Sequence, residues 1–410
     1  EMGLGKTLQV IALLDSIRDK EKHTLIVCPA SLIYNWEDEI RRFSDTLSCI
    51  SITGTKEQRK KRIHDISKYD ILITSYDYLR RDIEEYQDIT FEYVVLDEAQ
   101  NIKNQKTKNA TSVKELHSRH RLALSGTPIE NSLAELWSIF DFLMPGYLFS
   151  YHYFKTQYES PIVLNQNEDV IKKLRSFISP FILRRTKKEV LKELPDKVDH
   201  QYLIDFSKEE QKLYLANLTQ ASKELQAKMN EPHIDHIAIL AALTRLRQLC
   251  CDPRLLYDNI QKPSSKVQAC IELVQILTEH NKKVLLFSAF TSLIDLLTQE
   301  LEQNQISHYV LTGSTSKEER RQLVHAFQTD NTQVFLISLK AGGTGLNLTA
   351  AEAVIHIDPW WNISAQNQAT DRAHRIGQNA NVQVYRLIMK DSIEEKIVKM
   401  QERKKDLADT

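Results

Sequence analysis

Short runs of β-branched and apolar residues recur along this chain, and longer amphipathic segments separate them. This alternation is the pattern of βαβ units, which build parallel sheets covered by helices on both faces. It predicts an α/β fold with two groups of strands. The expected strands are residues 24–30, 71–76, 93–99 and 121–128 in the first group, and residues 283–290, 307–314, 334–339, 353–359 and 382–389 in the second.

The alternation stops in the middle of the chain. Residues 207–229 and 236–251 have helical spacing of apolar positions, and the middle has no strand-like alternation. We therefore expect three parts: a first α/β lobe over 1–146, helical protrusions and a connector over 147–262, and a second α/β lobe with a terminal helix over 263–410.

The composition excludes some classes of protein. With 54 basic and 55 acidic residues the net charge is −1, which argues against a protein coated in basic charge but leaves room for a local basic groove. No run approaches the ~20 apolar residues of a membrane span, so no membrane partner is expected. The five cysteines form no C-x-x-C pair, which favours buried free thiols in a reducing compartment over a zinc site.

Gly5-Lys6-Thr7 is the end of a phosphate-binding loop pattern, in which backbone N–H groups surround phosphates, the lysine reaches them and the threonine hydroxyl binds Mg²⁺. The apolar stripe after it predicts a helix whose N-terminus faces the phosphates. The alternative is a chance glycine turn before a helix. The first small residue of the pattern would precede Glu1 and the chain lacks an initiator methionine, so we expect it to be a segment of a longer protein.

Asp97 and Glu98 follow an apolar run, at the expected carboxyl end of a strand. One carboxylate can hold Mg²⁺ and the other can orient a water molecule that attacks a phosphate. Alone, the pair could equally be solvated acids that cap a helix; together with Gly5-Lys6-Thr7 it favours nucleotide chemistry. Residues 124–128, Leu-Ser-Gly-Thr-Pro, form either a tight turn or a sensor of nucleotide state.

Three further segments lie in the second group of strands. Arg372 and Arg375 are three apart, so on a helix they share a face and could stabilise a transferring phosphoryl group, although a solvated basic helix is the usual explanation. The glycine-rich residues 338–348 can approach a phosphate backbone closely. In residues 357–362 at least one tryptophan could belong to the core, or Trp361 could stack on nucleic acid.

In order, these segments resemble the motifs of helicase superfamily two, and more narrowly those of the Swi/Snf-type ATPases. The resemblance covers nearly the whole chain. It rests most on Ala-Gly-Gly-Thr-Gly-Leu-Asn-Leu (341–348) and Asp-Arg-Ala-His-Arg-Ile-Gly-Gln (371–378), and also on residues 28–36, 73–79, 181–197, 243–256 and 311–320.

The resemblance implies two RecA-like lobes with helical insertions between them, ATP and Mg²⁺ as cofactors, and duplex DNA as partner. Lys6 would bind phosphates, and Thr7 and Asp97 would ligate Mg²⁺. Glu98 would position the attacking water, and Gln100 would couple nucleotide binding to closure of the lobes. Arg372 and Arg375 would be arginine fingers that stabilise charge on the transferred phosphoryl group. Gly3, Gly5 and Gly345 would also contact nucleotide. The DNA contacts implied are Pro29, Ser31, Trp36, Ser75, Lys340, Gly342, Thr344 and Trp361.

Such proteins track along duplex DNA and displace or rearrange bound protein. The sequence Asp-Glu-Ala-Gln at 97–100 points to a bacterium or archaeon, hence to the cytoplasm and nucleoid; a eukaryotic source would make it nuclear. We expect a monomer. A strand-separating DNA or RNA helicase and an inactive binding scaffold remain alternatives. The terminal segment 391–410 either braces one lobe against the other or is a solvated helix.

Overall fold

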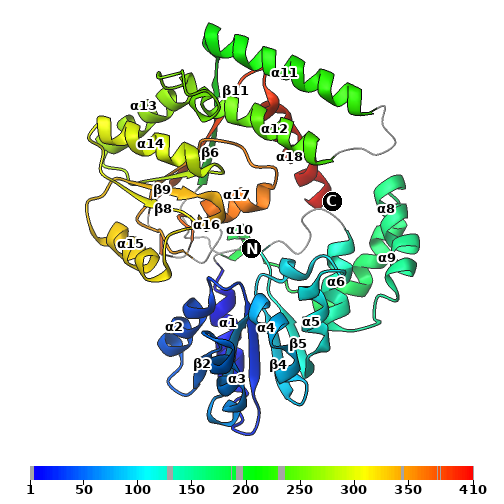
Figure 1. The fold of residues 1–410 in the computed structure, drawn as a ribbon. Coiled ribbons are helices and arrows are strands. Elements are labelled where there is room, and N and C mark those ends of the chain that lie inside the picture. The colour runs from blue at the N-terminus through cyan, green and yellow to red at the C-terminus, as the bar shows by residue number, and fades with distance from the viewer. Residues whose placement is uncertain are drawn as a thin grey trace. The chain divides into compact units, whose positions relative to one another are not determined.

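The computed structural model describes residues 4–126, 133–185, 187–190, 197–229, 236–342, 346–375, 377–378 and 380–409. The chain forms two compact units, Glu1–Lys192 and Glu193–Thr410 (Figure 1). Within the described residues, no helix is both long enough and apolar enough to cross a membrane.

The first unit is built on a five-stranded parallel sheet with strand order β2-β3-β1-β4-β5. The strands are β1 (Thr24–Cys28), β2 (Cys49–Ser51), β3 (Ile71–Ser75), β4 (Thr90–Leu96) and β5 (His117–Ala123). β1 and β3 are buried along their whole length. This explains their continuous apolar character, because a strand covered on both faces does not alternate.

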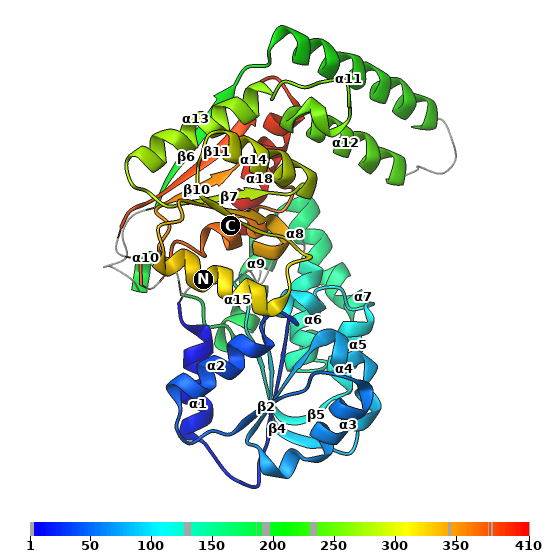
Figure 2. The same cartoon turned by 60° about the vertical axis from the view of Figure 1, so that its left-hand side comes forward.

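Helices cover both faces of this sheet. The α-helices of the unit are α1 (Lys6–Ser16), α2 (Ile33–Phe43), α3 (Lys56–His64), α4 (Tyr76–Arg81), α5 (Lys108–Glu115), α6 (Leu133–Leu143), α7 (Tyr151–Phe154), α8 (Ser160–Asn165), α9 (Glu168–Ile178) and α10 (Lys187–Val190). Ile26 and Ile73 point toward α1 and α2, whereas Leu25 and Leu72 pack with α4 and α5 on the opposite face. Figure 2 shows this two-sided arrangement around the strands.

A separate apolar cluster joins α6 to the helices that follow it. Its large members include Trp137, Phe140 and Phe154, with Leu174 contributed by α9. The unit also contains the 3₁₀ turns Ile66–Lys68, Ile83–Tyr86, Ala99–Ile102 and Ser179–Phe181, and the π-helical turn Lys155–Glu159. Part of the helical segment expected in the middle of the chain therefore packs with the first unit.

The second unit is built on a six-stranded parallel sheet with strand order β6-β11-β10-β7-β9-β8. The strands are β6 (Lys197–Ile204), β7 (Val284–Ser288), β8 (His308–Leu311), β9 (Val334–Ser338), β10 (Ala353–His356) and β11 (Val382–Met389). β7, β9 and β10 are buried throughout, as central strands of a doubly covered sheet must be.

The helices of the second unit also pack on both faces of its sheet. They are α11 (Lys208–Met229), α12 (His236–Cys251), α13 (Ser265–Glu279), α14 (Thr291–Gln303), α15 (Lys317–Thr329), α16 (Leu339–Gly342), α17 (Ile363–Thr370) and α18 (Ile393–Asp409), with a 3₁₀ turn at Pro253–Leu255. Leu286 faces the cluster that contains residues of α12, α13 and α14. Leu285 faces the cluster that contains residues of α15, α16 and α17.

The expected α/β class and its two groups of parallel strands are confirmed, as are the helices expected over 207–229 and 236–251. The expectation of a strand-free middle was wrong. β6 lies there and pairs in parallel with β11. It is an edge strand whose side chains are mostly exposed, so its sequence lacks the apolar run that marks a buried strand.

Candidate active site

The glycine loop leads directly into α1. Gly5 has a φ of 70°, in the left-handed region, and is the N-cap residue of α1; such a backbone favours glycine. Lys6 and Thr7 occupy the first turn and are half-buried. Ile11 and Leu14 anchor the helix in the core. The helix N-terminus thus presents backbone N–H groups beside a cationic and a hydroxyl side chain, which is a suitable site for phosphate.

Asp97 lies directly after β4, at the carboxyl edge of the first sheet, and its carboxylate is held from two sides. The indole Nε1–H of Trp36 donates to Oδ2 at 2.9 Å, and the backbone N–H of Glu98 donates to Oδ1 at 2.9 Å. The hydroxyl of Tyr76 donates to the Asp97 backbone carbonyl at 2.8 Å. Each carboxylate oxygen keeps lone-pair capacity for a further ligand.

The electrostatic environment of Asp97 is unusual for a carboxylate. Burial and the neighbouring Glu98 carboxylate raise the pKa of Asp97 to about 6, although the Trp36 and Glu98 hydrogen bonds and the charge of Lys6 act in the opposite direction. The influence of Lys6 shows that the glycine loop and Asp97 are within electrostatic reach of each other. A cation bound at Asp97 would offset the repulsion from Glu98.

Glu98 begins a chain of hydrogen bonds across the sheet edge. Its backbone has a φ of 50°, which is strained for a residue with a side chain and is common at functional sites. The amide Nε2 of Gln100 donates to Glu98 Oε2 at 2.6 Å, and the Ser125 hydroxyl donates to Gln100 Oε1 at 3.1 Å. Ser125 follows β5, which neighbours β4 in the sheet. The Glu98 carboxylate is therefore oriented by residues from two strand ends.

These residues fit ATP and Mg²⁺. A left-handed glycine at a helix N-terminus, a lysine within electrostatic reach of a buried aspartate, and a threonine hydroxyl form the donor set that Mg²⁺ and phosphates use in phosphate-binding loops. Magnesium sites of this kind take few protein ligands, because phosphate oxygens and water complete the shell. Gly3 and Gly345, expected at the nucleotide, lie outside the described residues.

The structure places the expected DNA-contact residues of the first unit in different environments. Ser31 is exposed and Pro29 is half-buried, both just before α2. Trp36 is 1% exposed and bonded to Asp97. Ser75 is 1% exposed and caps α4 by accepting the Tyr78 N–H at 3.2 Å. The side chains of Trp36 and Ser75 thus support the fold, and we leave them out of the proposed DNA contacts.

The expected helical face of Arg372 and Arg375 was wrong in its local structure. α17 ends at Thr370, and both arginines lie in the turns that follow it. The Arg372 carbonyl accepts the Leu348 N–H at 3.0 Å, and Arg375 Nη1 donates to the Leu346 carbonyl at 3.5 Å. The two arginines are thus attached to the segment after the glycine-rich loop. The Arg372 backbone and the Arg375 side chain make these two bonds, while the N–H groups of residues 371–374 still bond to carbonyls three or four residues earlier in the chain.

The glycine-rich segment is described only in part. Lys340 is exposed on α16, and Gly342 is buried at its end. A Cβ on Gly342 would lie 2.6 Å from Cε1 of Phe287, so close packing explains this glycine and we leave it out of the proposed DNA contacts too. Thr344 lies outside the described residues.

The two tryptophans after β10 differ in their packing. Trp360 packs against the core cluster that contains Phe287 and Phe335, whereas Trp361 is half-buried and is not part of that cluster. Arg247 of α12 lies over both rings. Trp360 therefore serves the core, and Trp361 remains the candidate for contact with DNA.

The sequence interpretation did not single out Tyr76, Arg247 or Gln401, and it included Ser125 only within the possible nucleotide sensor at 124–128. Ser125 lies beside the strand that ends at Asp97, where carboxyl ends of parallel strands gather site residues. Arg247 and Gln401 had no such signal, since their partners lie far away in the chain.

Two parallel α/β units in series, the first with a phosphate-type loop and an acidic strand end, define a helicase-like ATP-binding architecture. Comparison with known families agrees with this class. The model described as SNF2-related domain matches residues 1–255, and the model described as helicase conserved C-terminal domain matches residues 265–377. The chain belongs to the SNF2 family.

Similar proteins occur in bacteria and archaea. The chain is 41% identical to the Mycoplasma genitalium protein named "Uncharacterized ATP-dependent helicase MG018", with 99% of this chain and 39% of that protein covered. It is 40% identical to Bacillus subtilis YwqA, named as a candidate ATP-dependent helicase/translocase, over 100% of this chain and 45% of that protein. The chain spans about two fifths of the length of these curated relatives.

Among solved structures, the Sulfolobus solfataricus SWI2/SNF2 ATPase core in complex with double-stranded DNA is 36% identical, covering 99% of this chain and 86% of that chain, with a TM-score of 0.48. A TM-score below 0.5 does not by itself establish likeness in space. The family assignment therefore rests on the sequence matches.

Proposed function

We propose that this chain is the motor core of an ATP-dependent translocase that moves along double-stranded DNA and displaces or remodels bound protein. Its relatives in the SNF2 family carry names of ATP-dependent helicases. The bacterial relatives and the Asp-Glu-Ala-Gln sequence favour a prokaryotic source. The proposed setting is therefore nucleoid DNA in the cytoplasm, with the protein acting as a monomer.

In the proposed chemistry the residues of the first unit hold the nucleotide and orient water. Lys6 and the N–H groups after Gly5 bind phosphates, and the Thr7 hydroxyl and Asp97 carboxylate hold Mg²⁺, which supplies charge neutralisation when bound. Glu98 orients the attacking water. Gln100 holds the Glu98 carboxylate by one hydrogen bond and is itself held by Ser125 through another.

The residues of the second unit complete the proposal. Arg372 and Arg375 stabilise the charge that develops on the transferred phosphoryl group, since two cations at that position lower the barrier by electrostatics. Their attachment to Leu346–Leu348 would let the glycine-rich segment respond to hydrolysis. Gly345 belongs to this proposal by family resemblance.

The proposed DNA contacts are those expected residues that retain accessible surface. Ser31 precedes α2, whose N-terminal N–H groups can receive a backbone phosphate. Lys340 is exposed and can neutralise a phosphate. Pro29 and Trp361 are half-buried and offer apolar surface to a sugar or base.

The observation that carries the proposal is the continuous chain from Asp97 through Glu98 and Gln100 to Ser125 at one sheet edge. A strained Glu98 backbone and an oriented carboxylate favour a catalytic role over a purely structural acidic pair. They favour it over an inactive binding scaffold for the same reason.

The test is ATP hydrolysis by the full-length protein without nucleic acid and with single-stranded DNA, duplex DNA or RNA. A Lys6→Ala variant serves as the control for contaminating ATPase. We expect strong stimulation by duplex DNA and its loss in Lys6→Ala. A triplex-displacement assay on the same duplex then reports movement without strand separation.

Other outcomes would overturn the proposal. Stimulation mainly by single strands or RNA, with separation of a labelled duplex, would make the protein a strand-separating helicase. No hydrolysis under any of these conditions would make it a binding scaffold that retains the motifs.

A further inference from the structure

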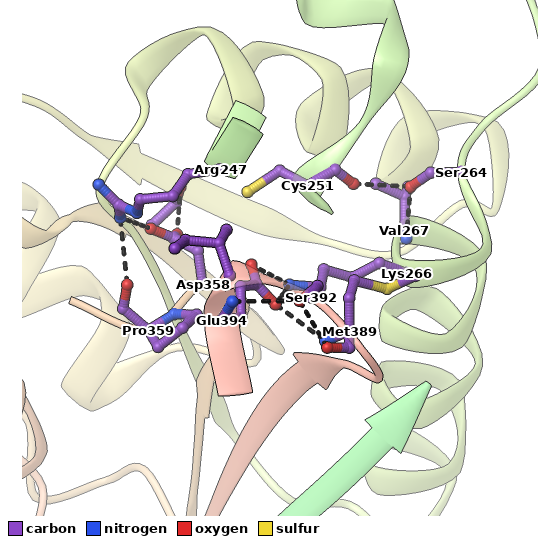
Figure 3. A network of polar contacts seen from close by, with 12 residues as sticks. Arg247, Cys251, Ser264, Lys266, Val267, Asp358, Pro359, Met389, Ser392 and Glu394 are labelled. Atoms are coloured by element: carbon purple, nitrogen blue, oxygen red, sulfur yellow. Dashed lines mark hydrogen bonds and ion pairs between the residues drawn. The ribbon is translucent and has the colours of Figure 1, made fainter. Parts of the chain in front are cut away.

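The segment after β10 is held by two helices from distant parts of the chain. Asp358 to Trp361 form the connection between β10 and α17. Arg247 of α12 contacts it from one side, and Gln401 of α18 contacts it from another. We call residues 358–361 the tryptophan loop. Figure 3 shows Arg247 beside Asp358 and Pro359 in this network.

Arg247 makes polar and ring contacts with the tryptophan loop at once. Its Nη2 donates to Asp358 Oδ2 and to the Pro359 carbonyl, both at 3.1 Å. The guanidinium carbon lies 5.0 Å from the ring centre of Trp360 and 5.9 Å from that of Trp361, within the range of cation–π attraction. The Arg247 side chain is only 4% exposed.

The opposite end of the ion pair is fixed to the sheet. Asp358 Oδ1 accepts from the Ser288 hydroxyl at 2.9 Å and from the Ala289 backbone N–H at 3.0 Å, both at the carboxyl end of β7. The Asp358 side chain is fully buried. Asp358 therefore connects Arg247 to the carboxyl end of β7. A different rotamer of Arg247 would leave the buried Asp358 carboxylate without its ion-pair partner.

The other helix holds the backbone of Trp360. Gln401 Nε2 donates to the Trp360 carbonyl and to Gln366 Oε1, and Gln366 Oε1 accepts the Trp360 N–H at 3.1 Å. Trp360 is thereby fixed by its backbone. For the Trp361 ring, the contact with Arg247 is the polar contact seen among the described residues.

We propose that Arg247 is a positioning residue that sets the Trp361 ring for contact with DNA and so connects α12 to the DNA-contacting surface of the second unit. This inference rests on the proposed function, in which Trp361 contacts DNA. A guanidinium packed between aromatic rings fixes a tryptophan rotamer more tightly than apolar packing alone, because the attraction depends on the ring face.

The experiment is a double-mutant cycle in the full-length protein. The variants are Arg247→Lys, Trp361→Ala and their combination, and the readout is the duplex DNA concentration that gives half-maximal ATPase. Arg247→Lys keeps the charge for Asp358 but removes the planar group over the rings. We expect it to raise the half-maximal DNA concentration about tenfold, at nearly unchanged maximal rate. In the combination we expect no loss beyond Trp361→Ala.

Arg254→Lys is the matched control. Arg254 is also an arginine with limited exposure that pairs with two carboxylates, Asp252 at 3.0 Å and Glu300 at 2.8 Å, and among the described residues none of its ion pairs or ring contacts involves the tryptophan loop. Its half-maximal DNA concentration should equal that of the wild type. An Arg247→Met variant, with its melting temperature, shows how much of any loss comes from unfolding.

Each outcome is decisive. If Arg247→Lys behaves as Arg254→Lys does, or if its effect adds in full to that of Trp361→Ala, the positioning role is refuted while the translocase proposal stands. If the wild type shows no stimulation by DNA, both proposals fail together.

Discussion

Asp97 and Glu98 are adjacent in sequence, yet the backbone gives them separate environments. Asp97 continues the line of β4 and is buried with two N–H donors on its carboxylate. The left-handed backbone of Glu98 turns its side chain toward Gln100. Two like carboxylates side by side thus acquire different surroundings, as metal binding and water activation require.

We predict that Ser125→Ala lowers turnover without weakening nucleotide binding. Loss of the hydroxyl frees Gln100 Oε1 and so loosens the Glu98 carboxylate, which should lower kcat about tenfold through misalignment. The measurement is steady-state ATPase with binding of a fluorescent ATP analogue. Ser112→Ala is the control, because the Ser112 hydroxyl bonds to the backbone carbonyl of Lys108 in its own helix. Equal kcat for both variants would contradict the role of Ser125.

His356 makes the second unit sensitive to acid. Burial, and to a smaller extent the nearby charge of Arg386, lower the pKa of His356 to about 3. Its ordinary value is 6.5, so below that pH the unfolded chain takes up a proton that the folded chain does not. The stabilisation from neutral His356 is therefore complete above about pH 6.5 and is lost progressively as the pH falls toward 3.

We predict a smaller loss of stability in acid for His356→Gln. Between pH 7.5 and pH 5 the histidine should cost the wild type about 2 kcal/mol of unfolding free energy that the variant does not lose. Glutamine can still bond to Thr370, the partner of His356 Nε2 at 2.9 Å. Urea unfolding at both pH values gives the two differences. Parallel pH dependence in the two proteins would show that His356 does not titrate as described.

Strands that are buried on both faces coincide with apolar runs in the sequence, whereas the edge strand β6 does not. β7, β9 and β10 coincide with apolar runs, because both faces of each strand are covered. β6 pairs with β11 along its full length but exposes most of its side chains. Backbone hydrogen bonds hold it in the sheet, and these bonds leave little pattern in the side-chain sequence from which the strand could be predicted.

α18 is attached to the second unit by a fully buried ion pair. Lys266 of α13 donates to both carboxylate oxygens of Glu394, at 2.7 and 2.6 Å, and neither side chain is exposed. Ile397 and Gln401 of α18 are buried as well. The first part of the terminal segment is therefore packed, not simply solvated, while bracing of one lobe against the other stays a prediction.

We predict that Lys266→Met destabilises the second unit by about 3–5 kcal/mol, because it leaves Glu394 buried without its partner. Adding Glu394→Leu should recover much of that loss, since an apolar pair of similar volume needs no desolvation compensation. Thermal and urea unfolding of the single and double variants measure both effects. A double variant less stable than Lys266→Met would show that the other hydrogen bonds of Glu394, such as that from the Met389 N–H, dominate.

The boundary between the two compact units differs from the boundary between the regions that match the two family models. The SNF2-related region extends to residue 255, but α11 and α12 belong to the second unit. Tyr214 of α11 accepts the Ile393 N–H at 2.8 Å, and Cys250 and Cys251 are buried in the core shared with α13. The division expected over 1–146, 147–262 and 263–410, with a helical part between two lobes, stays a prediction; in the structure the middle contributes helices to both units.

We predict that hydrolysis depends on both units. Arg372→Ala and Arg375→Ala should each lower kcat about a thousandfold, because each removes a cation that stabilises charge in the transition state. Binding of the ATP analogue should change by no more than a few fold, because the phosphate-binding loop is unaltered. Arg245→Ala, at an exposed arginine of α12, is the control. Full turnover in either finger variant would remove that arginine from the proposed chemistry.

The α/β class, nine strands at or near their observed bounds, the glycine turn before α1 and the acidic strand end could be derived from the chain alone, whereas β2 and β6 were not expected. Each depends on neighbours in sequence: apolar runs mark buried strands, and a left-handed glycine before a helix needs only local residues. The family resemblance added the roles expected of Arg372 and Arg375, and the SNF2 assignment is confirmed.

Contacts between distant residues were decided only by the tertiary structure. Trp36 meets Asp97 across 61 residues and Arg247 meets Asp358 across 111. Such pairs depend on strand order and helix packing, which no local periodicity encodes. Local sequence therefore determined most of the strands and helices, and the packing of the whole chain decided which side chains meet at the candidate site, because burial and pairing arise only when remote segments meet.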